Sequence, residues 1–258
     1  MKLSIDQAKS TQRSVASNFA WFGTFLLIIV SCFYLGWKTL ATVDFLYPFW
    51  YQQIGIDHAI DRFSPQNRYK NNFAETDDAE RFRLFNAILE AVQNEGKGLS
   101  SIKYHHPNGE PIDTLLRKAE IVHLQDVAKI ITAFFWAGLI STITLFPALV
   151  LLQIKKIPMP KITTLIVSLS AIFSVAGVLV LTIGPVKFFY ALHSYIFPDN
   201  HQWFFYYQDS LMTTMMLAPT LFGYIAFSWA LLSFIFIALL LQGCHYYIQN
   251  SISREKSK

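Results

Sequence analysis

The chain has 258 residues, of which 53% are apolar and only 15% are charged. A soluble globular domain usually carries about 25% charged residues. No Asp, Glu, Lys or Arg occurs in four long stretches, at residues 14–37, 130–154, 162–186 and 210–253. Each stretch exceeds the roughly 20 apolar residues that a helix needs to cross the hydrocarbon core of a bilayer. The composition therefore excludes a soluble enzyme, a disordered protein and a nucleic-acid-binding protein of the ordinary type.

Within these four stretches we predict membrane-spanning helices, because lipid offers no hydrogen-bond partner to an exposed backbone group. The first stretch differs from a cleaved signal peptide: its apolar run of about twenty residues is longer than the roughly 7–15 of a signal peptide, and no small-residue cleavage site follows it. The predicted spans are residues 18–37, 130–152, 162–183 and 218–242.

The basic residues predict how these spans are oriented. Nine Lys and Arg residues, against two carboxylates, lie in the segments 1–17, 153–161 and 243–258. Short segments rich in Lys and Arg stay in the cytoplasm. We therefore predict a multi-pass membrane protein with both termini inside. The extracytoplasmic parts are then a large domain at 38–129 and a loop at 184–217.

The large external domain shows the apolar spacing of a helix over residues 78–94, with Phe82, Phe85 and Ile88 on one face. The Asn108-Gly109 pair predicts a short hairpin turn. Asp113 is a suitable N-cap for a helix that begins at Thr114 and continues into the second span. The predicted fold class is an α-helical integral membrane protein: a bundle of four transmembrane helices capped by a mostly helical extracytoplasmic domain with a short hairpin.

The second external loop is rich in aromatic residues. Residues 187–197 have the pattern of a helix lying in the plane of the membrane. Five consecutive aromatic residues follow at 203–207. They are typical of an aromatic belt that anchors a helix end, and they equally fit the wall of a pocket for lipid.

Two histidines fall where chemistry on a lipid ester is possible. His123 lies shortly before the second span, with Glu120 and Asp126 three residues away on either side and so on the same helical face. A carboxylate that accepts one imidazole N–H leaves the other nitrogen free as a base. His193 follows the third span on the same predicted side of the membrane. We predict His123 as the base and His193 as its partner, although interfacial histidines also serve as plain hydrogen-bonding anchors.

Other candidates for chemistry are weaker. Asp209 and Ser210 precede the fourth span and are predicted to join the same external site. The adjacent pair His105-His106 lacks the spacing of metal ligands, so no metal site is predicted.

The segments around the two histidines resemble a known family. Residues 120–127 are similar to the Glu-x-x-His-x-x-Asp-Val signature of the bacterial lipoprotein intramolecular transacylases, a family once known as an integral-membrane domain of unknown function. The block from Leu192 through Phe197 and Trp203 to Asp209 is similar to the family's second histidine segment. The arrangement of four spans with a large first external loop also agrees.

The resemblance implies an enzyme that acts on the diacylglyceryl-modified N-terminal cysteine of a lipoprotein. It would move the sn-2 acyl chain to the α-amine of the same cysteine and leave a lyso-form lipoprotein, with no cofactor. It also implies that His123 and His193 are catalytic, that Glu120, Asp126 and Asp209 support them, and that the substrate pocket includes Phe197, Trp203 and Ser210. The partners are then the diacylated lipoprotein and membrane lipid, not nucleic acid.

Two alternatives remain at this point. One is another acyltransferase or hydrolase that uses the same histidines on phospholipid. The other is a non-enzymatic binding or assembly protein that docks through its external domain. Leu124, Ala128 and Leu192 depart from the residues usual in the family, so a paralogue with altered activity also fits the sequence.

The predicted orientation has a direct test. A reporter fused to the C-terminus should read as cytoplasmic, because nine basic residues favour that side for both termini and for the segment 153–161. Paired fusions of alkaline phosphatase and a fluorescent protein measure this. An external C-terminus would overturn the orientation.

Overall fold

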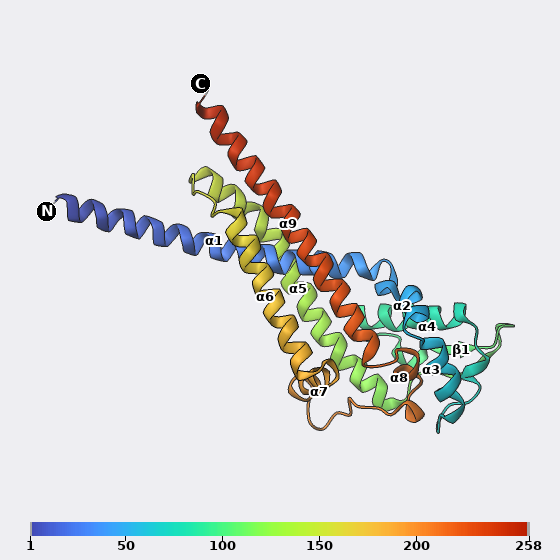
Figure 1. The fold of residues 1–258 in the computed structure, drawn as a ribbon. Helices are drawn as coiled ribbons and strands as arrows, with labels where there is room; N and C mark the ends of the chain where they lie inside the picture. The colour runs from blue at the N-terminus through green and yellow to red at the C-terminus, as the bar shows by residue number, and fades with distance from the viewer. Residues whose placement is uncertain (1, 257–258) are drawn as a thin grey trace. The chain divides into compact units, whose positions relative to one another are not determined.

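The computed structural model describes residues 2–256, with side chains described for residues 16–247 (Figure 1). It is mainly helical, and its α-helices are α1 (Lys2–Ala41), α2 (Tyr47–Gln53), α3 (Ile56–Phe63), α4 (Asp78–Gln93), α5 (Lys118–Ile154), α6 (Ile162–Ile183), α7 (Pro185–Ile196), α8 (Leu211–Met215) and α9 (Thr220–Lys256). Short 3-10 turns lie at Asp44–Leu46, Ser64–Gln66, Phe73–Glu75, Leu99–Ser101 and Tyr207–Asp209. The two strands are β1 (Lys103–His105) and β2 (Pro111–Thr114).

The chain divides into two compact units. One contains residues up to 36, residues 136–178 and residues from 230 onward; the other contains residues 37–135 and 179–229. Each is described by itself. We call the first the helical unit and the second the site unit.

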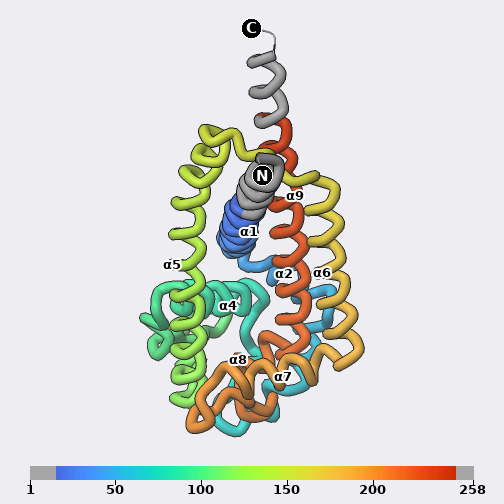
Figure 2. The backbone as a smooth tube through the Cα atoms, turned by 90° about the vertical axis from the view of Figure 1, so that its left-hand side faces the viewer, coloured from blue at the N-terminus to red at the C-terminus, as the bar shows by residue number. Residues whose placement is uncertain are grey.

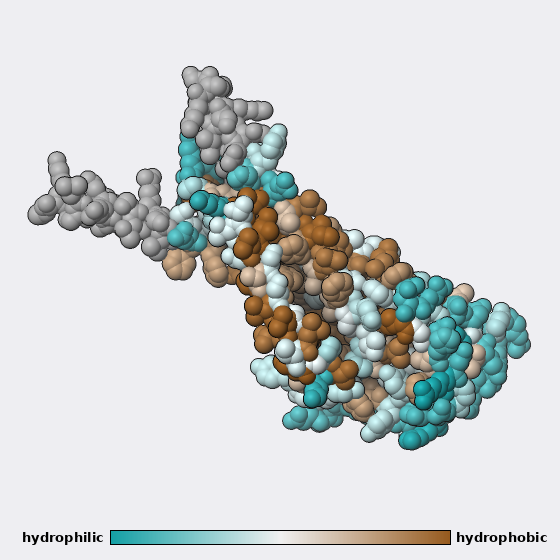
Figure 3. Space-filling model, viewed as in Figure 1, coloured by the Kyte–Doolittle hydropathy of each residue, from teal (hydrophilic) through white to brown (hydrophobic). Residues whose placement is uncertain are grey.

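Four helices are long and apolar enough to cross a membrane, over Ala16–Ala41, Lys118–Ile154, Ile162–Ile183 and Thr220–Tyr247. Large apolar side chains are exposed along them, and Figure 3 shows these as brown surface over the long helices. Such a surface is unfavourable in water and is satisfied by lipid. The structure therefore confirms the predicted fold class of a four-span helical membrane protein.

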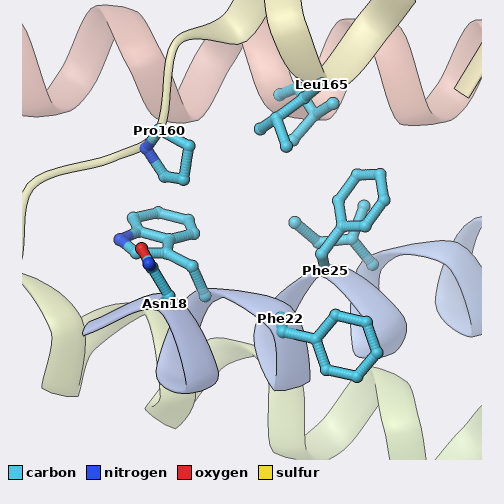
Figure 4. Close-up of a pocket in the computed structure, with 8 residues that line it drawn as sticks. Asn18, Phe22, Phe25, Pro160 and Leu165 are labelled. Atoms are coloured by element: carbon cyan, nitrogen blue, oxygen red, sulfur yellow. The ribbon is translucent and has the colours of Figure 1, made fainter. Parts of the chain in front are cut away.

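The helical unit has a small core in which α1, α5, α6 and α9 meet. Its buried side chains are Ile28, Cys32, Leu145, Leu169, Ile237 and Leu241. A cavity of about 190 Å³ lies beside this core and has a mainly apolar lining. In Figure 4, Phe25 projects toward Leu165, and Asn18 lies near Pro160.

The site unit has a larger core built around α4. Tyr47 stacks on Phe85 with ring centroids 4.0 Å apart, and its hydroxyl donates a hydrogen bond to the Met215 carbonyl at 2.6 Å. Arg81 is buried and donates to the hydroxyls of Thr76 and Tyr51. Because buried polar groups are costly unless they are paired, these bonds allow the aromatic core to form. The Tyr47 bond joins this core to the chain just before α9.

The predicted helix over 78–94 is confirmed as α4, whose N-cap Asp77 accepts a hydrogen bond from the Glu80 N–H at 2.8 Å. The predicted hairpin is confirmed as β1 and β2, which pair antiparallel. The prediction of a helix start at Thr114 is wrong. Thr114 pairs with Lys103 in the hairpin, and Asp113 binds Lys70 at 2.9 Å, so the helix begins only at Lys118.

The segment between α6 and α7 turns sharply, as Figure 2 shows. Gly184 has φ 93° there, a conformation that residues with a Cβ rarely adopt. The turn separates α7 from the preceding span. No side chain of α7 is buried, and five of its residues expose large apolar groups, at Val186, Phe188, Leu192, Tyr195 and Ile196.

The helical unit gives a prediction about packing. A Cβ on Gly138 of α5 would lie 2.4 Å from both Cβ and Cγ of Tyr34 on α1, so Gly138→Ala must push the two helices apart. We expect a loss of about 1–3 kcal/mol, the usual cost of overpacking, measured as a lower thermal midpoint in detergent. Gly177→Ala on α6 is the control, because a Cβ there meets nothing within 4 Å. Equal stability of the two variants would contradict this account.

Candidate active site

The two predicted histidines meet in the site unit. His123 lies on the second turn of α5 and His193 on the last turn of α7. Their ring centroids are 6.2 Å apart, although the residues are 70 positions apart in the chain. The segment that follows α7, residues 197–205, contributes the aromatic rings of Phe197, Trp203 and Phe205 to the same cluster.

His193 has a defined hydrogen-bonding state. Its Nδ1 is 2.8 Å from the carbonyl oxygen of Phe189, one turn earlier in α7. A carbonyl only accepts, so Nδ1 carries a proton, and in the neutral ring Nε2 is the nitrogen with a free lone pair. Burial lowers the pKa of the His193 imidazole below its ordinary value, and the bond to Phe189 opposes this shift only in part. His193 is therefore held neutral, with Nε2 as its basic atom.

His123 lies among aromatic rings. Its side chain is buried, and its ring centroid is 4.7 Å from that of Phe197 and 6.1 Å from that of Phe205. Within the described residues, neither ring nitrogen of His123 forms a hydrogen bond, and Nδ1 is fully buried. A buried polar atom without a partner is uncommon in native proteins, which sets His123 apart from an ordinary hydrogen-bonded histidine.

Glu120 does not orient His123, contrary to the role predicted for it. One carboxylate oxygen accepts the backbone N–H of Arg117 at 2.7 Å, which is one half of a capping box at the start of α5. The other accepts the hydroxyl of Ser210 at 2.5 Å. Ser210 in turn accepts the N–H of Thr213 and caps α8. Glu120 thus joins the beginnings of α5 and α8.

Asp126 also binds elsewhere. Its Oδ2 is 2.5 Å from Nδ1 of His201, and its Oδ1 accepts from Lys129 at 2.8 Å. Asp126 does lie on the same face of α5 as His123, as the spacing predicted, but its imidazole partner is a different histidine. Residue spacing gave no indication of His201, because 75 residues separate it from Asp126.

The remaining predicted residues divide into two groups. Phe197 and Trp203 contact the histidine rings, with Trp203 5.4 Å from His193 between ring centroids. Asp209 pairs instead with Arg68 at 3.3 Å. Ser210 binds Glu120, and no contact of Ser210 with either histidine is found among the described residues.

Arg117 was not predicted from the sequence. Its guanidinium lies over the rings of Tyr69 at 4.5 Å and Phe205 at 5.7 Å, and the second of these rings also contacts His123. A cation over an aromatic face is attracted by the ring quadrupole. Arg117 therefore helps hold Phe205 against His123. Among the described residues, no cluster of His, Cys, Asp and Glu side chains could hold a metal ion.

The fold and this site define a class: an α-helical integral membrane protein with a buried pair of histidines among aromatic rings. The family model for the lipoprotein intramolecular transacylase Lit matches residues 19–222. The chain belongs to this family, and it is accordingly an acyltransferase. A comparison with curated protein sequences finds no match.

Solved structures of similar fold come from the same family. The membrane-integral lipoprotein intramolecular transacylase Lit from Bacillus cereus has a TM-score of 0.66 and 16% identity, over 95% of this chain and 100% of that one. A variant of that protein with a histidine replaced by alanine has a TM-score of 0.62 and 17% identity, over 97% and 100% of the two chains. At these identities the similarity shows the fold alone.

Proposed function

We propose that this chain transfers an acyl group within bacterial lipoproteins. The sn-2 acyl chain of the diacylglyceryl-cysteine would move to the α-amine of the same cysteine and leave a lyso-form lipoprotein. Family membership supports the reaction class. The observation that carries the site assignment is the approach of His123 and His193 to 6.2 Å between ring centroids.

The reaction needs one proton to move and one oxyanion to be stabilised. The neutral amine attacks the ester carbonyl, so a C–N bond forms and the carbonyl oxygen becomes negative. The C–O bond to the glyceryl group then breaks. The amine loses a proton and the glyceryl oxygen gains one. The proton count therefore balances without a cofactor, and an amide replaces an ester.

The contacts favour a division of these tasks that differs from the sequence-based prediction. His123 was predicted as the base because Glu120 and Asp126 were expected to orient it, but both carboxylates bind other groups. His193 has its Nδ1–H fixed on Phe189 and its Nε2 free. We therefore propose that His193 Nε2 takes the proton from the amine and returns it to the glyceryl oxygen. His123 then donates an N–H hydrogen bond to the oxyanion, a kind of stabilisation that often dominates catalysis.

The surroundings support a lipid substrate at the membrane surface. Aromatic rings line the histidine pair, and α7 exposes apolar side chains, with Tyr195 88% exposed. An apolar, exposed helix suits the membrane interface. We propose that the site lies at the extracytoplasmic face of the bacterial cytoplasmic membrane, where the diacylated lipoprotein and membrane lipid are its partners.

The histidine assignment predicts a loss of activity. His123→Phe, which removes the N–H donor, should lower turnover about 10²–10³-fold, and His193→Gln, which removes the base, should lower it about 10²–10⁴-fold. Mass spectrometry of the N-terminal peptide of a purified diacylated lipoprotein measures the transfer, because it places the second acyl chain on glycerol or on nitrogen. His58→Gln is the matched control, since His58 is an exposed histidine on α3 and is not part of the pair.

Other results would point elsewhere. Normal turnover in both variants would remove the histidines from the mechanism. A released fatty acid in place of N-acylation would indicate a hydrolase. Unchanged lipoprotein with wild-type protein would favour a binding or assembly role.

The lowered pKa of His193 predicts the pH profile. A base must be neutral, and burial lowers the pKa of His193 below 6.5, so its protonation should cost activity only at a pH below that value. The substrate α-amine, with an ordinary pKa of about 7.7–8.0, is protonated and loses reactivity already as the pH falls through that higher range. The slope of log kcat/KM against pH should therefore be about one near neutrality and steepen to about two only in more acidic buffer. A steepening already above pH 6.5 would contradict His193 as the base.

A further inference from the structure

Residues 198–205 have neither helix nor strand, so no backbone ladder fixes them. Their backbone and amide bonds stay local: the His201 N–H donates to Pro198, and Gln202 donates to Phe204. Within the described chain, one hydrogen bond joins this segment to another element, and it is the bond between His201 and Asp126. We call residues 198–205 the aromatic segment.

The aromatic segment and the residue before it cover His123. Phe197 precedes the segment and Phe205 ends it, and both rings are buried and contact the imidazole of His123. Trp203, inside the segment, contacts His193. The rings around both histidines are therefore carried by a stretch of chain whose own backbone does not hold it in place.

The partner of His201 is well placed to hold that stretch. Asp126 is buried and lies one turn after His123 on the same face of α5. Its second oxygen is occupied by Lys129. A carboxylate that accepts from an imidazole N–H makes a stronger and more directional bond than a neutral acceptor.

We propose that His201 is a positioning residue for the transacylase reaction: its bond to Asp126 fixes the aromatic segment against His123 and His193. The proposal rests on the proposed function. His201 uses Nδ1 for this bond, and no ring contact joins it to either histidine of the pair within the described residues. It acts through the rings it holds and does not itself move a proton.

Two substitutions of His201 distinguish a role in positioning the aromatic segment from a role in proton transfer. His201→Phe removes the N–H donor and should lower kcat about 10–100-fold, because small misplacements of reacting groups have effects of that size. His201→Asn keeps an N–H donor at a similar position but has no titrating ring. It should therefore retain kcat within about threefold of wild type. Transfer is measured by the same lipoprotein mass spectrometry, with thermal midpoints to show that both variants fold.

A double substitution tests the bond itself. Asp126→Ala and His201→Phe should each lower kcat. The kcat of the double variant should be no lower than that of the less active single variant, because both substitutions remove the same interaction. Independent, additive losses would overturn the proposal. His58→Phe is the control for loss of an exposed histidine ring.

A labelling experiment tests the same proposal without measuring enzyme activity. Diethyl pyrocarbonate should modify His123 faster in His201→Phe than in wild type or in His201→Asn, because the rings over His123 are released. Equal labelling of His123 in all three proteins would overturn the proposal, as would a His201→Asn variant as slow as His201→Phe. If wild-type protein transfers no acyl group at all, the proposed function fails, while the labelling result still tests the role of His201.

Discussion

The buried carboxylate of Glu120 determines where the site forms. Its side chain is 1% exposed, and a buried charge is tolerated only when it is paired and hydrogen-bonded. The Arg117 N–H, the Ser210 hydroxyl and the Arg117 guanidinium at 3.4 Å meet that requirement. These bonds fix the first turn of α5, and His123 is only three residues further on. They also fix the start of α8, and thus the end of the aromatic segment.

The sequence predicts the membrane spans well, because a run without charged residues can be read directly from the sequence and a helix satisfies its own backbone hydrogen bonds. It also predicts that His123 and His193 lie near each other, because both are expected at a similar depth relative to the membrane and on the same side. It fails at Asp113, where a good N-cap residue lies in a strand. Asp113 pairs with Tyr104 in the hairpin and its carboxylate binds Lys70, and these contacts outweigh the local preference. Spacing places Glu120 and Asp126 on the face of His123, but it cannot reveal Ser210 and His201, which reach them from 90 and 75 residues away.

The aromatic surroundings and the chemistry of the histidines are consistent with each other. An imidazole among Phe and Trp rings is held neutral by desolvation, as the lowered pKa of His193 shows. A neutral ring is what both tasks require, because a base needs a lone pair and a neutral donor still has an N–H. In the proposed mechanism the same rings would also contact an acyl chain, so the surface that binds lipid would be the one that sets the protonation state of the two histidines.

The helix α5 runs without interruption from Lys118 to Ile154. If the span begins at residue 130, as the sequence predicts, we expect His123 to lie up to about 10 Å beyond the hydrocarbon edge, because each residue rises 1.5 Å. A glyceryl ester that reaches this level draws part of its acyl chain out of the lipid. In the proposed site the lost contact with lipid would have to be replaced by protein, and Phe197, Trp203 and Phe205 around the two histidines are placed to replace it. A segment that formed this apolar wall outside the bilayer would need an anchor of its own, and the proposed role of the bond between His201 and Asp126 is to supply it.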